Sequence, residues 1–279
     1  MDKQKLCQVL YVALNNIYNA HEINNITNYV WYDIQNKSRG KYSSLEHFLE
    51  APAYKNLIAN LLEKVPIQYV LTSADFMGLD LLVTPDVLIP RPETEGLVQW
   101  ILDDHPNAAL FNVLDIGTGS GCIALALKKF RPNWNLFALD VSEKALEIAS
   151  TNADKLNLKI SFIQADLFED EDKVPVFCNL IVSNPPYISK LEMDQMDAHV
   201  LLYEPNVALF PKGDDPLIFY KWIAEFVQKN VAEPTWIYLE LNALQWEAIE
   251  QIFLNASFKD IEIKKDLESL NRMMRIRKL

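Results

Sequence analysis

Five residues with Gly-x-Gly-x-Gly spacing stand between an apolar run and a helical pattern, and this arrangement restricts the fold more than any other part of the chain. The apolar run, Val113–Ile116, is typical of a buried strand, and the helical pattern begins at Cys122. Glycine permits positive φ and lets a ligand approach the main chain closely. A helix that starts directly after such a loop presents backbone N–H groups to the ligand. The sequence therefore predicts a ligand-binding loop made of Gly117, Thr118, Gly119, Ser120 and Gly121.

A second strand and an acidic residue support this interpretation. Leu136–Leu139 is again apolar and runs into Asp140, about 20 residues after the loop. An acid at that place can accept hydrogen bonds from both hydroxyls of a ribose. Cys122 stands where a dinucleotide-binding fingerprint has its third glycine, which disfavours a nicotinamide cofactor.

The tetrapeptide Asn184-Pro185-Pro186-Tyr187 follows directly on the apolar strand 180–183. Proline has no N–H, so the local carbonyls cannot all be used in ladder or helix bonds. The Asn184 oxygen and these carbonyls form a rigid cluster of acceptors, which suits a planar –NH2 group with two donors. Tyr187 can lie against the flat group. The tetrapeptide predicts a site that holds an amide or amino nitrogen, and the alternative is a proline-rich turn after a core strand.

Strands and helices alternate through most of the chain. Apolar runs of strand type lie at 113–116, 136–140, 160–164, 180–183 and 236–240, and helical patterns start near Cys122, Ser142, Leu217 and Ala243. This alternation predicts a parallel sheet with helices on both faces. The last two runs, 261–264 and 273–277, have no helix between them and should form an antiparallel pair. Ligands bind beyond the carboxyl ends of such strands, so the glycine loop, Asp140, Asp166 and Asn184 should meet at one rim.

The first part of the chain has a different pattern. Residues 1–64 show helical periodicity, which predicts a small helical domain. Residues 65–92 alternate short apolar and polar stretches around Gly78 and Asp86, which predicts a β-hairpin connector. The α/β domain should then span residues 93–279. The chain opens on an amphipathic helix and not on a signal peptide, with apolar residues at Leu6, Val9, Leu10, Ala13, Leu14 and Ile17.

Together these motifs resemble class I S-adenosylmethionine-dependent methyltransferases. Within that class the chain is similar to the HemK-like glutamine N5-methyltransferases, which modify the Gln of the Gly-Gly-Gln motif in peptide-chain release factors. The resemblance runs from about Pro66 to the C-terminus, and its most family-specific string is Ile89-Pro90-Arg91-Pro92-Glu93-Thr94-Glu95. It implies a Rossmann-like, seven-stranded methyltransferase domain that uses S-adenosylmethionine.

The resemblance also implies how the substrate is held. Asn184 and the Pro185 carbonyl would each accept one N–H of the glutamine amide, with Pro186 beside them. Tyr187 would pack on the amide. The helical domain, residues 1–64, would dock the release factor.

For the cofactor, the resemblance implies contacts along the whole rim. Asp166 would accept a hydrogen bond from the adenine amino group, and Leu167 or Phe168 would cover the ring. The alternative for Asp166 is a plain helix cap. The rest of the expected cofactor site consists of Gly117, Thr118, Gly119, Ser120, Gly121, Asp140 and Asn184.

Three residues depart from the pattern of the family. Pro216, Asn242 and Ser269 each stand where a glycine is usual. Asparagine tolerates left-handed backbone better than most residues. These departures concern local loops and leave the expected cofactor and amide sites intact.

The charge balance bears on the substrate. Net charge is −12, from 26 basic and 38 acidic side chains. Affinity for a phosphate backbone comes mostly from basic side chains, so this balance favours a protein substrate and disfavours direct binding of nucleic acid. The three cysteines are widely spaced and indicate neither disulfides nor a zinc site, and no apolar run reaches the length of a membrane span. We expect a cytoplasmic monomer without a metal or a membrane contact.

Two other functions stay open on the sequence. A nucleic-acid methyltransferase acting on adenine N6 or guanine N2 could hold an exocyclic amine in the same acceptors. It would need a basic, aromatic-lined groove for the extruded base. A cofactor-binding protein without catalysis would have no use for the Asn184–Tyr187 tetrapeptide.

Overall fold

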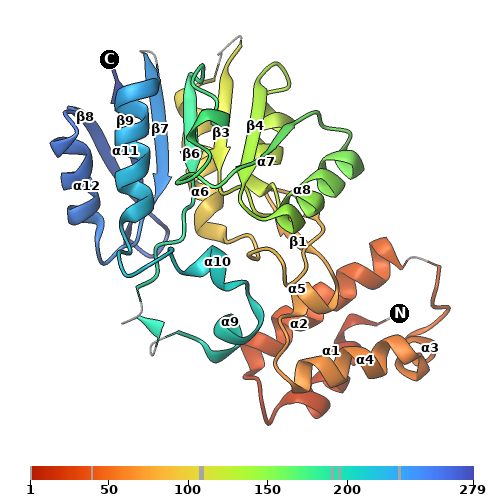
Figure 1. Ribbon diagram of the computed structural model, residues 1–279. Helices are drawn as coiled ribbons and strands as arrows, with labels where there is room; N and C mark the ends of the chain where they lie inside the picture. Colours follow the sequence, from red (N-terminus) through yellow and green to blue (C-terminus); the bar gives the residue numbers. More distant parts are fainter. Residues whose placement is uncertain (1, 39, 107–109, 190–191, 194–195, 232–233) are drawn as a thin grey trace. The chain divides into compact units, whose positions relative to one another are not determined.

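The structure is a computed structural model that describes residues 2–38, 40–106, 110–189, 192–193, 196–231 and 234–279 (Figure 1). The chain forms two compact units. Residues 1–73 and 198–203 make up the first unit, and residues 74–197 and 204–279 make up the second.

The first unit is helical, as the sequence predicts. Leu6, Leu10 and Leu14 lie one turn apart on α1 and are fully buried in the core of this unit. Asn19 and Glu22 form a capping box that satisfies the first N–H groups of α2. The elements of this unit are α1 (Lys3–Leu14), α2 (Ala20–Tyr32), the π-helical turn η1 (Asp33–Lys37), α3 (Leu45–Glu50), α4 (Pro52–Leu62), α5 (Ile67–Val70) and α9 (Ala198–Tyr203).

The second unit opens with the predicted hairpin. Strands β1 (Ala74–Phe76) and β2 (Leu79–Leu81) pair antiparallel, and Gly78 turns between them with a φ of 74°. The hairpin is shorter than the predicted connector 65–92, because α5 occupies the start of that range. Ile67 of α5 packs in the core of the first unit, which keeps this stretch helical.

A seven-stranded sheet forms the centre of the second unit, in the order β5-β4-β3-β6-β7-β9-β8 (Figure 1). Strands β3 to β7 pair in parallel, and β9 runs antiparallel to β7 and β8. The predicted parallel sheet with an antiparallel pair at its end is therefore confirmed. The strands are β3 (Asn112–Ile116), β4 (Asn135–Asp140), β5 (Ser161–Gln164), β6 (Leu180–Ser183), β7 (Thr235–Glu240), β8 (Asp260–Lys265) and β9 (Asn271–Lys278).

Helices cover both faces of this sheet. Side chains alternate along each strand, so Val113 and Leu180 join one core whereas Leu114 and Ile181 join the other. The first core is closed by α6 (Pro92–Asp104), α7 (Cys122–Phe130) and α8 (Glu143–Leu156). The second is closed by α11 (Ile218–Asn230) and α12 (Trp246–Asn255), and the short elements η2 (Glu171–Lys173) and α10 (Asn206–Leu209) lie in the connections.

The predicted helix starts hold at three of four places. Helix α7 begins at Cys122, α8 follows its N-cap Ser142, and α11 follows Leu217. The start near Ala243 was wrong by three residues, because Asn242 closes a turn by accepting from the Gln245 N–H at 3.0 Å. Among the helices of the described ranges, none has the length and apolar character required to span a bilayer.

One buried amide connects the hairpin with the glycine loop. Asn152 of α8 is 0% exposed. Its Oδ1 accepts from the Leu82 N–H at 2.6 Å, and its Nδ2 donates to the carbonyls of Leu82 and Ser120, both at 3.0 Å. The side chain therefore satisfies three backbone groups that have little access to water.

We predict that Asn152→Ala lowers the free energy of unfolding by about 1–3 kcal/mol, since it leaves buried donors and acceptors unsatisfied. Urea denaturation measures this loss. Thr151→Ala on the exposed side of the same helix serves as the control and should change stability by about 0.5 kcal/mol or less. Equal losses in the two variants would contradict the bridging role of Asn152.

Candidate active site

The carboxyl ends of four parallel strands lie at one edge of the sheet. Ile116 at the end of β3 pairs with Leu139 of β4 on one side and with Ser183 of β6 on the other. Gly117 and Asn184 therefore leave adjacent strands side by side. Ser183 pairs in turn with Leu239 of β7, so the next residue of that strand, Glu240, belongs to the same edge.

The glycine loop has the backbone that its sequence predicts. Gly117, Gly119 and Gly121 have φ of 72°, 54° and 82°, which L side chains rarely adopt. A Cβ on Gly117 or Gly119 would meet no atom within 4 Å, so a ligand can approach the main chain there. At Gly121 it would come within 3.1 Å of Ala149 Cβ, so this glycine instead lets α7 pack closely on α8.

The polar side chains of the loop are buried on its inner side. Thr118 is 4% exposed and donates from its hydroxyl to Asp115 Oδ2 at 2.7 Å. The same oxygen accepts from the Ala124 N–H at 3.2 Å. Burial raises the pKa of Asp115 to about 7, and these two bonds oppose the shift. Ser120 is also buried, at 2% exposure, so Thr118 and Ser120 shape the loop from within.

Asp140 holds the loop from the neighbouring strand. Its Oδ2 accepts from the Gly119 N–H and its Oδ1 from the Ser142 N–H, both at 2.9 Å. Burial raises the pKa of this carboxyl group above its usual range, and the two N–H bonds oppose that shift. A carboxylate has further lone pairs, so these bonds are compatible with the predicted contact to ribose hydroxyls.

Asp166 makes the capping contact that the sequence analysis gave as the alternative to a contact with adenine. Its Oδ1 accepts from the Phe168 N–H at 2.9 Å, as in a cap, and its Oδ2 lies 3.6 Å from Lys212 Nζ. Leu167 is 5% exposed, whereas Phe168 is half-buried against Phe219, with ring centroids 5.3 Å apart. Both Leu167 and Phe168 line the pocket described next, so either can reach a ring held there.

These residues surround a pocket of about 530 Å³. Its lining includes most of the predicted site, namely Gly117, Gly119, Asp140, Asp166, Leu167, Phe168, Asn184, Pro185 and Pro186. Thr118, Ser120, Gly121 and Tyr187 lie outside this lining. Two segments that the sequence analysis did not place here, residues 86–88 and 205–212, contribute further walls.

A half-buried ion pair joins the segments that carry those two further walls. Arg91 Nη2 lies 2.5 Å from Glu204 Oε1, and Glu204 Oε2 accepts from the Ile89 N–H at 3.3 Å. Glu204 is buried, whereas the Arg91 side chain is 34% exposed. The segment before α6 and the segment before α10 are thereby held together beside the pocket.

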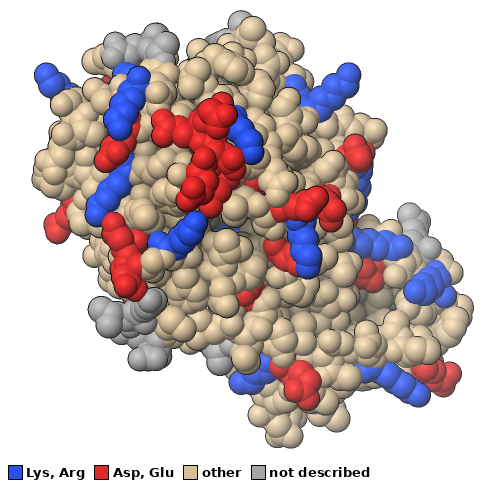
Figure 2. Space-filling view, viewed as in Figure 1, with Lys and Arg blue, Asp and Glu red and all other residues tan. Residues whose placement is uncertain are grey.

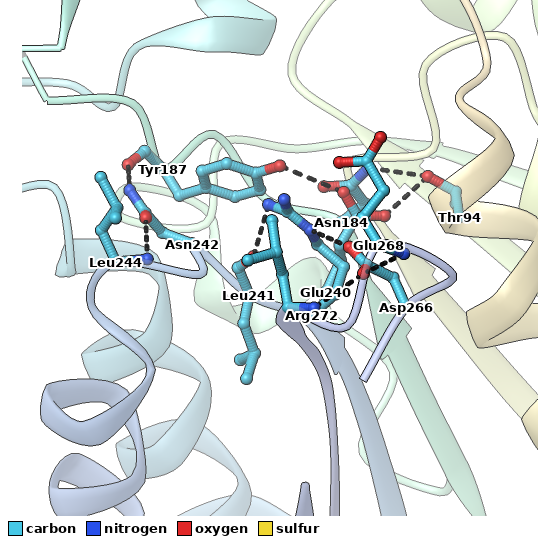
Figure 3. A network of polar contacts seen from close by, with 11 residues as sticks. Thr94, Asn184, Tyr187, Glu240, Leu241, Asn242, Leu244, Asp266, Glu268 and Arg272 are labelled. Carbon is cyan, nitrogen blue, oxygen red and sulfur yellow. Dashed lines mark hydrogen bonds and ion pairs between the residues drawn. The ribbon is translucent and has the colours of Figure 1, made fainter. Parts of the chain in front are cut away.

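Behind the tetrapeptide lies a polar network (Figure 3). Asn184 Nδ2 donates to Thr94 Oγ1 at 3.2 Å, and Thr94 Oγ1 donates to Glu240 Oε2 at 2.6 Å. The Tyr187 hydroxyl donates to Glu240 Oε1 at 3.1 Å, and that of Tyr220 donates to the Glu240 backbone carbonyl at 2.9 Å. The sequence analysis missed Thr94 and Glu240. The available signals were a threonine inside the family-specific string and an acid at the end of a strand buried on both faces.

The unusual residues at three glycine positions have different consequences. Ser269 adopts a φ of 66°, so its turn keeps the left-handed backbone that a glycine would give. Asn242 is not among the described residues with positive φ, and its side chain is a buried link that donates to the Tyr187 carbonyl at 3.2 Å. Pro216 lies in the turn before α11, where a missing N–H is tolerated.

Comparison with known proteins assigns the chain to a family. Residues 96–222 match a family model described as methyltransferase small domain. The release factor glutamine methyltransferase of Flavobacterium psychrophilum is 40% identical over 226 residues, which cover 80% of this chain and 79% of that protein. The chain belongs to the release factor glutamine methyltransferase family. The relative from Lactococcus lactis subsp. lactis is 38% identical over 261 residues, or 93% of this chain and 91% of that protein.

A solved structure of low sequence identity has the same fold as this chain. A methyltransferase from Pyrococcus furiosus is 18% identical, with a TM-score of 0.54, and the match covers 78% of this chain and 96% of that one. The family uses S-adenosylmethionine, which is therefore the cofactor of this methyltransferase. The open backbone at Gly117 and Gly119 and the carboxylate of Asp140 on the pocket wall fit this cofactor.

We predict that Asp140→Ala weakens binding of S-adenosylmethionine and of S-adenosylhomocysteine alike, by about ten-fold to a hundred-fold, because a charged acceptor is lost. Calorimetry on both compounds measures the change. Asp154→Ala, an exposed acid on α8, controls for the change in charge. Unchanged affinity together with a large drop in melting temperature of the apo protein would mean that Asp140 serves only to hold Gly119 and Ser142.

Proposed function

We propose that this enzyme transfers a methyl group from S-adenosylmethionine to the side-chain amide nitrogen of the Gln in the Gly-Gly-Gln motif of peptide-chain release factors. The observation that carries this proposal is the position of the Asn184-Pro185 acceptors. They line the same pocket as the glycine loop, because they follow β6, which pairs with the strand that precedes the loop. An amide held by them would stand beside the cofactor. The substrates named for the relatives from F. psychrophilum and L. lactis agree with this proposal.

The chemistry depends on orientation. An amide nitrogen shares its lone pair with the carbonyl and is a poor nucleophile. Bound S-adenosylmethionine supplies a strongly electrophilic methyl group. The Asn184 oxygen and the Pro185 carbonyl would accept the two N–H groups and hold the lone pair in line for a direct displacement. Alignment of this kind can lower a barrier by roughly 7–11 kcal/mol.

The environment of Tyr187 bears on its proposed role. This side chain packs on the second core, and its hydroxyl is bonded to Glu240, so its ring has a fixed place beside Asn184. We propose that the ring supports the flat amide and that the hydroxyl takes no part in proton transfer. The amide nitrogen becomes more acidic as the new N–C bond forms, so we assign no histidine or carboxylate as a base.

Surface charge bears on the nucleic-acid alternative. Figure 2 shows acidic and basic side chains interspersed on the face in view. Among the described residues of that face, the basic side chains form no continuous stripe. With a net charge of −12, this distribution favours a protein over a phosphate backbone. We therefore propose that the substrate is a protein. We also propose that the enzyme is a cytoplasmic monomer.

We predict that Asn184→Ala nearly abolishes transfer while cofactor affinity stays within a few-fold. The substrate amide would lose one of its two acceptors, at a cost of about 1–3 kcal/mol, and would also lose its alignment. Asn255→Ala changes an exposed asparagine at the end of α12, outside the pocket lining, and should retain activity. Turnover of Asn184→Ala above about a tenth of wild type, an energy difference of about 1.4 kcal/mol, would overturn the role of this residue.

A second prediction concerns residues 1–64, for which we propose a docking role. Intact release factor should be methylated far faster than a free peptide containing Gly-Gly-Gln, because remote contacts supply positioning energy. Deletion of residues 1–64 should depress activity on the intact factor much more than on the peptide. Activity on the peptide controls for the integrity of the catalytic unit, and mass spectrometry should place one methyl group on the Gln.

Two results would contradict these proposals. Equal activity of the full and truncated chains on the intact factor would exclude docking by residues 1–64. Methylation of oligonucleotides but not of release factor would replace the proposed substrate with a nucleic-acid amine.

A further inference from the structure

A chain of hydrogen bonds leads from a buried carboxylate to the side chain that is proposed to hold the substrate. Glu240 is 2% exposed and Thr94 is 2% exposed, and their bond measures 2.6 Å. Thr94 also accepts from Asn184 Nδ2 at 3.2 Å (Figure 3). These three residues come from β7, from α6 and from the segment after β6, so the contacts are tertiary.

The order of donors and acceptors in this chain follows from the charge of Glu240. An ionised carboxylate only accepts, so the single hydroxyl hydrogen of Thr94 has to point to Glu240. The Thr94 oxygen is then left with lone pairs, which can accept only from the –NH2 end of the Asn184 amide. The oxygen at the other end of that planar amide is therefore turned away from Thr94, on a side chain that lines the pocket.

We propose that Glu240 and Thr94 are positioning residues, which make Asn184 present its oxygen and not its –NH2 group to the substrate amide. The inference rests on the proposed function, because the orientation matters only if Asn184 accepts an N–H from the substrate. Neither residue touches the substrate. Their contribution is to exclude the flipped orientation of Asn184.

Protonation of Glu240 would remove this control. A neutral carboxyl group can donate to the Thr94 oxygen, and the Thr94 hydroxyl can then donate to Asn184. The amide of Asn184 would turn over to accept that bond. Its –NH2 group would then face the –NH2 group of the substrate, so two donors would meet and only the Pro185 carbonyl would remain to accept. Activity should therefore fall as the pH decreases through the pKa of Glu240.

The surroundings of Glu240 set its pKa and therefore the pH at which activity is lost. Burial raises the pKa of Glu240 above the usual carboxyl range, whereas the bonds from Thr94 and Tyr187 and the charge of Arg272 oppose the shift and Glu93 adds to it. Arg272 is itself paired with Asp266, at 3.2 Å. The titratable groups that face Glu240 from the surrounding elements are Glu93 on α6, Cys122 on α7, Tyr187 after β6, Tyr220 on α11 and Arg272 on β9.

The first test compares three threonine variants of the full chain on intact release factor. Thr94→Val keeps the shape but removes the link, and should lower kcat by about 10- to 100-fold, as a misaligned substrate would. The dissociation constant of S-adenosylmethionine should stay within about three-fold, since neither Thr94 nor Glu240 lines the pocket. Thr94→Ser restores a hydroxyl and should recover most of kcat. Thr235→Val removes a buried hydroxyl at the opposite end of β7 and should leave kcat unchanged.

The second test is the pH dependence of kcat. Wild type should lose activity on acidification, with an apparent pKa above the usual carboxyl range. Tyr187→Phe removes one donor to Glu240 and should move this acidic limb to higher pH. Glu240→Gln can donate its –NH2 group to Thr94, as the protonated carboxyl group does, so its kcat should be low. It carries no titrating group at this position, so the acidic limb should be absent.

The outcomes separate this inference from the proposed function. If wild type does not methylate release factor, the proposed function fails and so does the inference that rests on it. If wild type is active, then wild-type kcat in Thr94→Val, or an acidic limb that persists in Glu240→Gln, overturns the positioning role alone. Two further results overturn it. One is a loss of kcat in Thr94→Val that Thr94→Ser does not recover. The other is an equal loss of kcat in Thr235→Val, with an equal drop in melting temperature.

Discussion

The parallel register of β4, β3, β6 and β7 is the constraint on which the whole site depends. Parallel neighbours end at the same edge, so Leu139, Ile116, Ser183 and Leu239 stand in one row. Each of these strands then delivers one part of the site in the next residues. A shift of one residue in any pairing would turn the following side chain to the opposite face of the sheet. The glycine loop, the acid and the acceptor cluster therefore remain together only while this register holds.

Buried polar groups hold the parts of the site in place. Asn152 links the glycine loop to the hairpin, and Asn242 links the Tyr187 carbonyl to the end of β7. Glu240 accepts hydrogen bonds from Thr94 and from Tyr187, the last residue of the Asn184 tetrapeptide. A buried polar group costs free energy unless it is hydrogen-bonded, so each of these residues stabilises one arrangement and disfavours the alternatives. The orientation of the proposed acceptor is then a property of the interior of the domain.

Much of this fold follows from local patterns. Short apolar runs between turn residues predict the strands, and a glycine loop before Cys122 predicts positive φ because other residues adopt it at a cost. The same reasoning failed where side-chain contacts override the local pattern. Asn242 Oδ1 accepts from the Leu244 N–H in a turn that delays α12. Ile67 packs into the core of the first unit, where part of the predicted connector forms α5. Such outcomes depend on which partners the folded chain brings within reach, and periodicity carries no information about them.

By itself, the sequence determined the alternation of strands and helices, the backbone of the glycine loop and the acceptors of the Asn184 tetrapeptide. Each of these lies in a short stretch whose backbone is restricted by glycine, proline or apolar spacing. Tertiary structure alone decided which side chains stand behind them. Thr94 lies 90 positions from Asn184 and 146 positions from Glu240 in the chain, and it is hydrogen-bonded to both. No local pattern links residues so far apart. Their contact depends on the pairing of β6 with β7 and on the packing of α6 beside the sheet. The direction of the hydrogen bonds, and so the orientation of the Asn184 amide, is fixed only when these three residues are in contact.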